Sequence, residues 1–285
     1  MNPNEEVMTY LRTEYQGVLS EEEILDHYER YVNFIQAREL ISRFQLFPLL
    51  PRNLLDIGCG YGSFVIEARK IGIAAQGIDS SRFEIDFARN RLSSSLPQKI
   101  DASEIFILGD SISLEIPENK YEVITALNVL EHVSDRDVFL EQVFRSLRPG
   151  GSFHFICPNY ASWRREAHYR VMWAPYLSKK LAHRYLQARS RNPFFLDNFI
   201  FPVYKRSLIH KLKNLGFSIH PPPHRLLKLE NPSLIYSRYL RLGLVVGKRL
   251  RLLILVRAII TLWTRNPFTR GIDLVARKYQ CDSLP

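Results

Sequence analysis

Short apolar runs alternate with amphipathic stretches through the middle of this chain. Five runs have the length and the Ile, Leu and Val content of buried strands: LLDIG (54–58), IAAQGID (73–79), EIFILGD (104–110), YEVITALNV (121–129) and GSFHFIC (151–157). Amphipathic stretches predict helices between them, at 63–71, 81–92 and 135–147. Because strands that alternate with helices pair in parallel and are covered on both faces, the pattern predicts a doubly wound α/β protein.

The flanking segments predict further helices and two more strands. Apolar positions at helical spacing predict that 5–47 is helical, with Ser20 as an N-cap. Residues 203–219 predict a helix followed by a short strand, and residues 271–279 alternate as an edge strand does. Together with the central runs, these strands predict one seven-stranded, mostly parallel sheet.

Composition changes along the chain and indicates four parts. We expect an N-terminal helical cap at 1–50 and a cofactor-binding α/β core at 51–157. An aromatic and basic segment at 158–202 is expected to be a substrate lid. Residues 203–285 complete the core and carry a basic amphipathic insertion at 222–268.

Charge is distributed unevenly between these parts. The formal net charge is +10, but residues 1–157 sum to −9, residues 158–202 to +6 and residues 203–285 to +13. The three cysteines are widely spaced and form no CxxC pair, which argues against a disulfide framework or a cysteine-based metal site. The acidic N-terminus lacks an apolar stretch with a cleavage site, so we expect a cytoplasmic protein.

The basic segment 239–263 has no long charge-free run, which argues against a membrane-spanning helix. Its Leu, Ile and Arg content is typical of an interfacial helix, so an anionic membrane surface is one expected partner, with the protein peripheral on the inner face of a membrane. A helix packed on its own domain or a dimer contact are the alternatives. Nucleic acid is the least favoured partner, since phosphate contacts need no long aliphatic face.

The stretch LLDIGCGYGSF (54–64) carries the most specific chemistry. A strand ends, three glycines follow at alternate positions, and a helix begins. Glycines here let the backbone turn sharply and approach a ligand closely. A dinucleotide site has the spacing G-x-G-x-x-G, whereas Ser63 stands where the third glycine would be. Asp56 precedes the turn, and a carboxylate there suits a cationic ligand better than a pyrophosphate.

This segment resembles motif I of class I S-adenosylmethionine-dependent methyltransferases. Further elements follow in the family's order: QGIDSS around Asp79, ILGDS around Asp110, ALNVLEHVSD (126–135) and LRPGG (147–151). The set is most similar to small-molecule methyltransferases that include the ubiquinone-biosynthesis O-methyltransferases. The resemblance covers about residues 50–157, and it implies a Rossmann-like methyltransferase fold with an antiparallel last strand.

The resemblance also implies a cofactor, S-adenosyl-L-methionine, and the residues that hold it. The glycine turn would cradle the methionine part, Asp79 would hold the ribose hydroxyls, and Asp110 would meet the adenine amino group. The implied binding residues are Asp56, Gly58, Gly60, Gly62, Asp79, Ser80, Asp110, Ser111 and Asn128.

A sulfonium carries its methyl group already activated, so the reaction needs alignment and no metal, and we expect no metal site. For a hydroxyl acceptor a base adds about 10²–10⁴-fold. The catalytic candidates are His132, His154 and Tyr160, with His168 as a further candidate base, although packed structural roles for His132 and His154 stay open. We expect methyl transfer to a small lipophilic or ring-bearing acceptor, at oxygen. Methylation of a sugar or cell-envelope polysaccharide precursor, or a degenerate fold acting as a membrane- or RNA-binding scaffold, are the alternatives.

Overall fold

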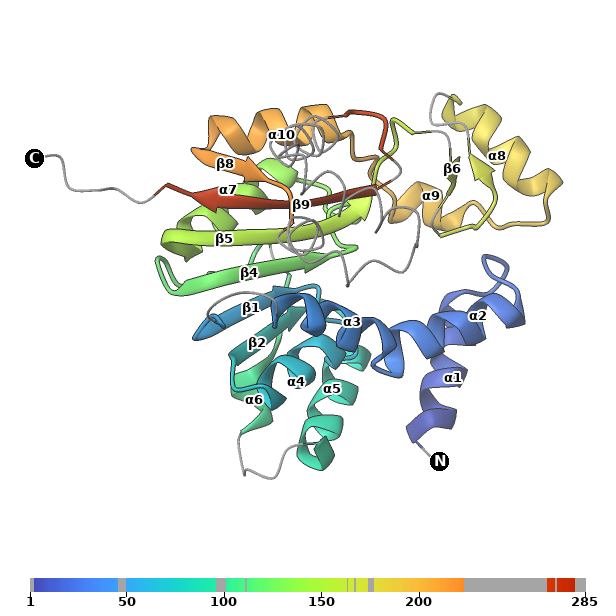
Figure 1. Cartoon of the computed structure of the whole chain (residues 1–285). Helices are drawn as coiled ribbons and strands as arrows, with labels where there is room; N and C mark the ends of the chain where they lie inside the picture. The colour runs from blue at the N-terminus through green and yellow to red at the C-terminus, as the bar shows by residue number, and fades with distance from the viewer. Residues whose placement is uncertain are drawn as a thin grey trace, which may run out of the picture.

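Seven strands form one sheet in the computed structural model of this chain (Figure 1). The structure describes residues 3–45, 50–95, 101–110, 112–162, 164–166, 168–173, 177–222, 266–269 and 271–279. The strands of this sheet are β1 (Asn53–Ile57), β2 (Ala74–Asp79), β3 (Phe106–Leu108), β4 (Tyr121–Leu127), β5 (Leu147–Pro158), β8 (Phe217–His220) and β9 (Gly271–Lys278). Their order across the sheet is β3-β2-β1-β4-β5-β9-β8.

The sheet confirms the predicted fold class. Strands β1 to β5 pair in parallel, whereas β9 runs antiparallel to both of its neighbours, β5 and β8. The prediction that 271–279 is an edge strand was wrong. Strand β9 lies inside the sheet and β8 forms the edge, because the chain runs back between β5 and β8 after the insertion. The apolar and polar residues of β9 alternate because its two faces pack differently. Sequence periodicity alone cannot distinguish such an interior strand from an edge strand.

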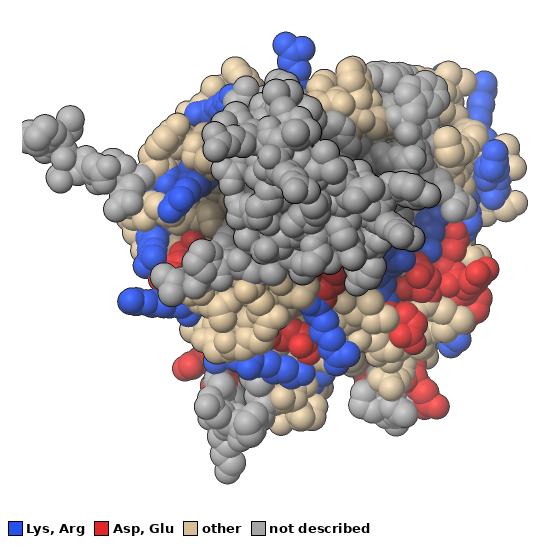
Figure 2. All heavy atoms as spheres, in the orientation of Figure 1, with Lys and Arg blue, Asp and Glu red and all other residues tan. Residues whose placement is uncertain are grey.

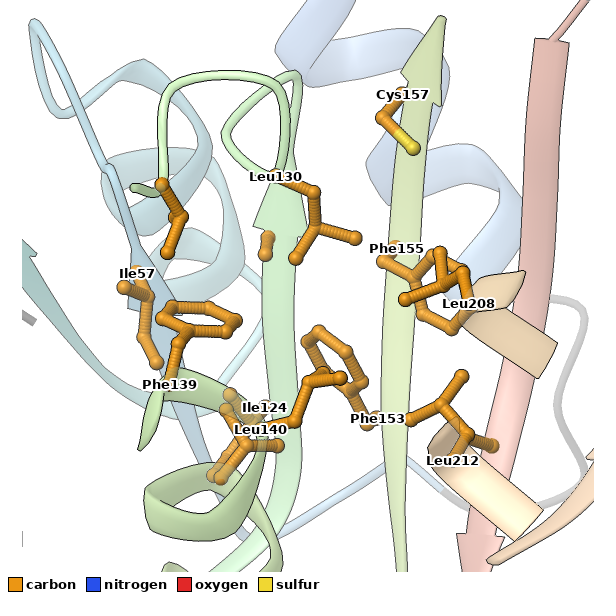
Figure 3. Packing of buried hydrophobic residues seen from close by; sticks show 14 of the residues in the cluster. Ile57, Ile124, Leu130, Phe139, Leu140, Phe153, Phe155, Cys157, Leu208 and Leu212 are labelled. Carbon is orange, nitrogen blue, oxygen red and sulfur yellow. The ribbon is translucent and has the colours of Figure 1, made fainter. Parts of the chain in front are cut away.

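Helices cover both faces of the sheet. The helices of the described residues are α1 (Pro3–Glu14), α2 (Glu21–His27), α3 (Ile35–Phe44), α4 (Ser63–Lys70), α5 (Arg82–Ser95), α6 (Ala102–Ile105), α7 (Arg136–Ser146), α8 (Lys179–Ala188), α9 (Phe194–Asn198) and α10 (Lys205–Asn214). Apolar residues of α3, α4 and α5 pack on one face, and those of α7 and α10 on the other. Figure 3 shows the second cluster, in which α7 and α10 lie against Phe153 and Phe155 of β5.

The element boundaries correct several predictions. The stretch 5–47 is helical in separate pieces, since a π-helical turn, η1 (Tyr28–Val32), follows α2 and Phe34 then takes a left-handed conformation with φ 63°. Ser20 caps α2 as predicted, within a reciprocal capping box with Glu23. The third predicted strand begins too early, because 104–105 belong to α6.

The lid segment combines α8 and α9 with a short hairpin of β6 (Arg164–Arg165) and β7 (Met172–Trp173), and it contacts the N-terminal helices. Arg191 of the lid donates hydrogen bonds to Val18 O at 2.7 Å and to Glu23 at 3.0 Å. Basic side chains gather over α8 and acidic ones over α2 in Figure 2. Opposite charge therefore joins two segments that are far apart in the sequence.

The insertion falls almost wholly outside the part of the chain that the structure describes. Residues 223–265 and 270 are not described, and the predicted interfacial segment 239–263 lies among them. Within the described ranges, no helix combines the length and apolar character needed to cross a lipid bilayer.

Candidate active site

A cleft of about 650 Å³ opens at the carboxyl ends of the parallel strands. Its floor is built from the turns that follow β1, β2, β3 and β4, and its walls come from the N-terminal helices and the lid. In doubly wound sheets this edge is where ligands bind, because the loops that leave the strands converge there. The volume is typical of sites for small molecules.

The glycine turn between β1 and α4 forms one end of this cleft. Gly58, Gly60 and Gly62 all have left-handed backbone conformations, with φ of 71°, 52° and 73°. A Cβ on Gly58 would lie 2.3 Å from Val129, and one on Gly62 would lie 2.6 Å from the ring of Phe106. Both the backbone angles and the space therefore require glycine. The turn presents bare backbone to the cleft, as the sequence predicts.

Asp79 joins this turn to the end of β2. Its carboxylate accepts hydrogen bonds from the amide of Gly60 at 2.8 Å and the amide of Ser81 at 2.9 Å. Burial raises the pKa of Asp79, against the opposing effect of these backbone donors. The residue lines the cleft, and its carboxylate holds the turn in place there.

Two more carboxyl groups, buried Asp56 and half-buried Glu84, lie beside the turn. Asp56 is 2% exposed and accepts a hydrogen bond from the Thr125 hydroxyl at 2.6 Å, and burial raises its pKa to about 8. Burial and the charge of Asp79 also raise the pKa of Glu84 to about 8. Sequence reasoning missed Glu84. The spacing Ser81-x-x-Glu84 at the start of α5 was the available signal, since the Glu84 amide donates to the Ser81 hydroxyl at 3.3 Å.

The other predicted cofactor residues take different positions. Asp110 lies exposed after β3, lines the cleft and accepts a hydrogen bond from the Ile112 amide at 2.9 Å. Ser80 and Asn128 also line the cleft, and Asn128 has a left-handed φ of 60°. Ser111 lies outside the described residues.

Aromatic and imidazole rings line one wall of the cleft. Tyr15, His27 and Tyr31 come from the N-terminal helices, with the His27 ring centroid 4.9 Å from Tyr15 and 4.6 Å from Tyr31. Phe195 and Phe199 of the lid line the same wall. Burial lowers the pKa of His27 to about 4, which keeps this ring neutral. The cleft thus combines a polar end, at the glycine turn and Asp79, with an aromatic end.

Two histidines meet in this aromatic end. His132, in the turn after β4, and His168, in the lid, approach each other with 3.2 Å between their Nε2 atoms. His132 Nδ1 lies 2.7 Å from the carbonyl oxygen of Phe199. His168 Nδ1 lies 2.8 Å from Glu166 Oε1, which also accepts a hydrogen bond from Tyr160 at 2.8 Å. Of the predicted catalytic residues, His132 faces the cleft, whereas Tyr160 is buried behind His168.

The surroundings of the two rings shift their pKa values in opposite directions. Burial, and then the neighbouring His168, lower the pKa of His132 to about 4, although its ring keeps an accessible edge in the cleft. For His168 burial acts downward, but the Glu166 carboxylate outweighs it and raises the pKa above its ordinary value. His132 is therefore the neutral ring at physiological pH.

The third predicted catalytic residue, His154, lies elsewhere. Its ring points from β5 toward α3, with its centroid 5.2 Å from that of Phe44, and Nε2 lies 3.0 Å from the Ser152 hydroxyl. It lines a separate small cavity together with Phe44 and Phe64. The alternation of side chains along a strand places it under the sheet rather than at its edge.

Comparison with known proteins identifies relatives of this architecture. A family model described as a methyltransferase domain matches residues 26–221. Norajmaline N-methyltransferase of Rauvolfia serpentina is 30% identical over 101 residues, which make up 35% of this chain and 34% of that protein. A ubiquinone biosynthesis O-methyltransferase of Pseudomonas entomophila is 29% identical over 111 residues, 39% of this chain and 46% of that protein. The chain thus spans less than half the length of these curated relatives.

Solved structures share the fold. Phosphoethanolamine N-methyltransferase 2 of Haemonchus contortus aligns with a TM-score of 0.54 at 19% identity, covering 94% of this chain and 59% of that one. An S-adenosylmethionine-dependent methyltransferase of Mesorhizobium loti aligns with a TM-score of 0.50 at 18% identity, covering 86% and 100%. At these identities the likeness concerns the fold alone.

Proposed function

This chain belongs to the methyltransferase-domain family, the class I S-adenosylmethionine-dependent methyltransferases, and we propose that it transfers a methyl group from S-adenosylmethionine to a small acceptor. One observation carries the proposal. The glycine turn, which has no room for a Cβ at Gly58 or Gly62, opens with half-buried Asp79 into the same cleft as His132. A donor site and an acceptor site therefore share one cavity.

The residues of the cleft fit the donor. Bare backbone at the glycine turn allows close approach of its amino-acid end, and the carboxyl groups of Asp56 and Glu84 add acceptors at that end. Asp79, which lines the same cleft, would accept hydrogen bonds from the ribose hydroxyls. When bound, the donor supplies a methyl group already activated by its positive sulfur.

The chain's task is then to align the acceptor and exclude water. The ring-lined wall of Tyr15, Tyr31 and Phe195 favours a lipophilic or ring-bearing acceptor, because such a ligand buries apolar area against these side chains. The lid and the N-terminal helices form this wall, and they limit the access of water to the reacting atoms.

We further propose that the accepting atom is oxygen. His132 Nδ1 faces a carbonyl oxygen, which only accepts, so Nδ1 carries the proton and Nε2 has a lone pair. Nε2 can take the proton that a hydroxyl loses as its oxygen bonds to the methyl carbon.

Methyl-transfer assays with the purified full chain test these proposals. Ring-bearing alcohols and phenols, amines and sugars would be offered in turn, with formation of S-adenosylhomocysteine as the readout. We expect turnover with hydroxyl acceptors, and His132→Ala should lower kcat by about 10²–10⁴-fold without weakening donor binding. Turnover only with amines would overturn the oxygen assignment. Absence of calorimetric heat with about 1 mM S-adenosylmethionine would overturn the donor assignment itself. A dissociation constant above that concentration would exceed the typical range of KM values.

Contact with an anionic membrane surface is proposed for the segment 239–263, from its sequence pattern alone. Flotation with anionic vesicles at low salt tests it, with neutral vesicles as the control. We expect co-flotation that 1 M salt reverses, because surface charge is screened at that ionic strength. Deletion of 225–265 without any effect on flotation would overturn the proposal.

A further inference from the structure

The two cleft histidines face each other through atoms that cannot both be hydrogen-bond acceptors. Their Nε2 atoms lie 3.2 Å apart. His132 Nδ1 lies 2.7 Å from a backbone carbonyl, and His168 Nδ1 lies 2.8 Å from the Glu166 carboxylate. When both rings are neutral, each Nδ1 therefore carries the ring proton, and each Nε2 would direct a lone pair at the other. Such a pair is stable only with a positive species between the rings, either a proton or a metal ion.

A third ligand group completes a set. Glu131 precedes His132 in the turn after β4, and its carboxylate lies with the two imidazoles in a group whose ligand atoms are all within 4.8 Å of one another. The Glu131 side chain is 1% exposed, whereas the edge of His132 is open. All three residues line the cleft, so the open side of the group faces the acceptor end.

We propose that Glu131, His132 and His168 bind a divalent transition-metal ion of the zinc type. Two imidazole nitrogens about 2.0–2.1 Å from a tetrahedral ion lie about 3.3–3.4 Å apart, close to the distance between the two Nε2 atoms. Two imidazoles and one carboxylate suit zinc and its neighbours better than magnesium or calcium, which prefer oxygen ligands alone.

The groups behind the histidines support the assignment independently. Metal-binding histidines almost always donate their other ring N–H to a carboxylate or a carbonyl, which fixes the ring and makes the ligand nitrogen more basic. His168 donates to Glu166 and His132 donates to Phe199 O. Glu166 is itself held by the Tyr160 hydroxyl at 2.8 Å and by the amides of His168 and Tyr169 at 2.8 Å and 2.7 Å. The rings are therefore preorganised.

The site joins the lid to the core. His168 comes from the segment between β6 and β7, whereas Glu131 and His132 follow β4. A bound ion would link these two parts beside the aromatic wall, with an open position toward the cleft. In the proposed methyl transfer, an acceptor hydroxyl could occupy that position, and the ion would lower the hydroxyl's pKa in place of His132 Nε2. This last consequence rests on the proposed function, whereas the binding of the ion does not.

Titration with Co²⁺ tests the site, because the visible absorption of the bound ion reports its ligands without any turnover. The full chain, free of a histidine tag and stripped with a chelator, should bind one equivalent of Co²⁺, and Zn²⁺ should displace it. Glu166→Gln removes the group that holds the His168 ligand and should weaken binding about 10–100-fold. His168→Ala removes the ligand itself, so it should weaken binding by at least about 10-fold. Glu131→Gln keeps the side-chain shape and provides a second variant if His168→Ala does not fold.

His183→Ala is the matched control. His183 also pairs with a carboxylate, Asp197 at 2.9 Å, but lies in α8 outside the group. This variant should bind Co²⁺ as the parent does. A parent chain without saturable binding, or binding unchanged in both His168→Ala and Glu131→Gln, would overturn the proposal. Calorimetry with S-adenosylmethionine separates this failure from failure of the proposed function, because the glycine turn shares no residue with the metal set.

Discussion

Arg170 of the lid forms an ion pair with Asp26 of α2, with 2.7 Å between the guanidinium and the carboxylate. Both groups lie at the rim of the wall where an acceptor is proposed to bind, and Arg170 itself lines the cleft. The hydrogen bond to Arg170 holds the pKa of Asp26 below its ordinary value. This contact joins the lid to the cap, two segments that the sequence presents separately.

A double-mutant cycle on Arg170→Ala and Asp26→Ala should give a small coupling free energy. The side chains are 27% and 41% exposed, so water screens the pair, and we expect about 0.2–1 kcal/mol at low salt and less at 1 M salt. Urea unfolding provides the measurement. Arg30→Ala is the control, because Arg30 lies farther from the same carboxylate, at 3.5 Å. A coupling above about 2 kcal/mol would contradict the screened pair.

Asp79→Ala should weaken donor binding by about 1–3 kcal/mol, or roughly 5- to 150-fold. The substitution removes a carboxylate from the cleft and releases the amide of Gly60, which it holds at 2.8 Å. Calorimetry with S-adenosylmethionine measures the loss. Asp86→Ala is the control, since this aspartate of α5 is 54% exposed and lies outside the cleft lining. Parent-like affinity in Asp79→Ala would show that another residue holds the ribose.

Gly62→Ala should destabilise the chain more than Gly72→Ala. Both glycines have positive φ, at 73° and 90°, so each substitution costs about 1–2 kcal/mol in backbone strain. At Gly62 the new Cβ would also lie 2.6 Å from Phe106 and 2.7 Å from Ala88, whereas at Gly72 nothing lies within 4 Å. Crowding adds about 1–3 kcal/mol at Gly62 alone. Equal losses in urea unfolding would mean that the turn can move away from Phe106.

Glu84→Gln should stabilise the donor-free protein at alkaline pH. Burial and Asp79 raise the pKa of Glu84 from 4.5 to about 8 in the folded state. Between these values the folded chain holds a proton that the unfolded chain has lost, so the stability contributed by this group falls as the pH rises from 4.5 to about 8. The melting temperature of Glu84→Gln minus that of the parent should therefore increase across this window. Glu22→Gln, an exposed change on α2, should show no such trend.

Sequence alone determined the features of this protein that depend on residues close together in the chain. Apolar runs placed the parallel strands, because a strand buried on both faces needs continuous Ile, Leu and Val. The alternate glycines predicted the turn after β1. Only glycine readily adopts the left-handed backbone angles of this turn in the space beside Val129 and Phe106. The resemblance to class I methyltransferases singled out Asp79 at the end of β2, where parallel strands bring their loops together.

Tertiary structure decided which side chains meet. Local periodicity could not place β9 inside the sheet, because the partners of a strand come from distant segments. His132, His154 and Tyr160 were all catalytic candidates from sequence, yet one faces the cleft, one packs on Phe44 and one lies behind His168. The distance between His132 and His168 is set by how the lid folds onto the core. Sequence specifies the chemistry of each group, and only packing brings two groups within 3.2 Å.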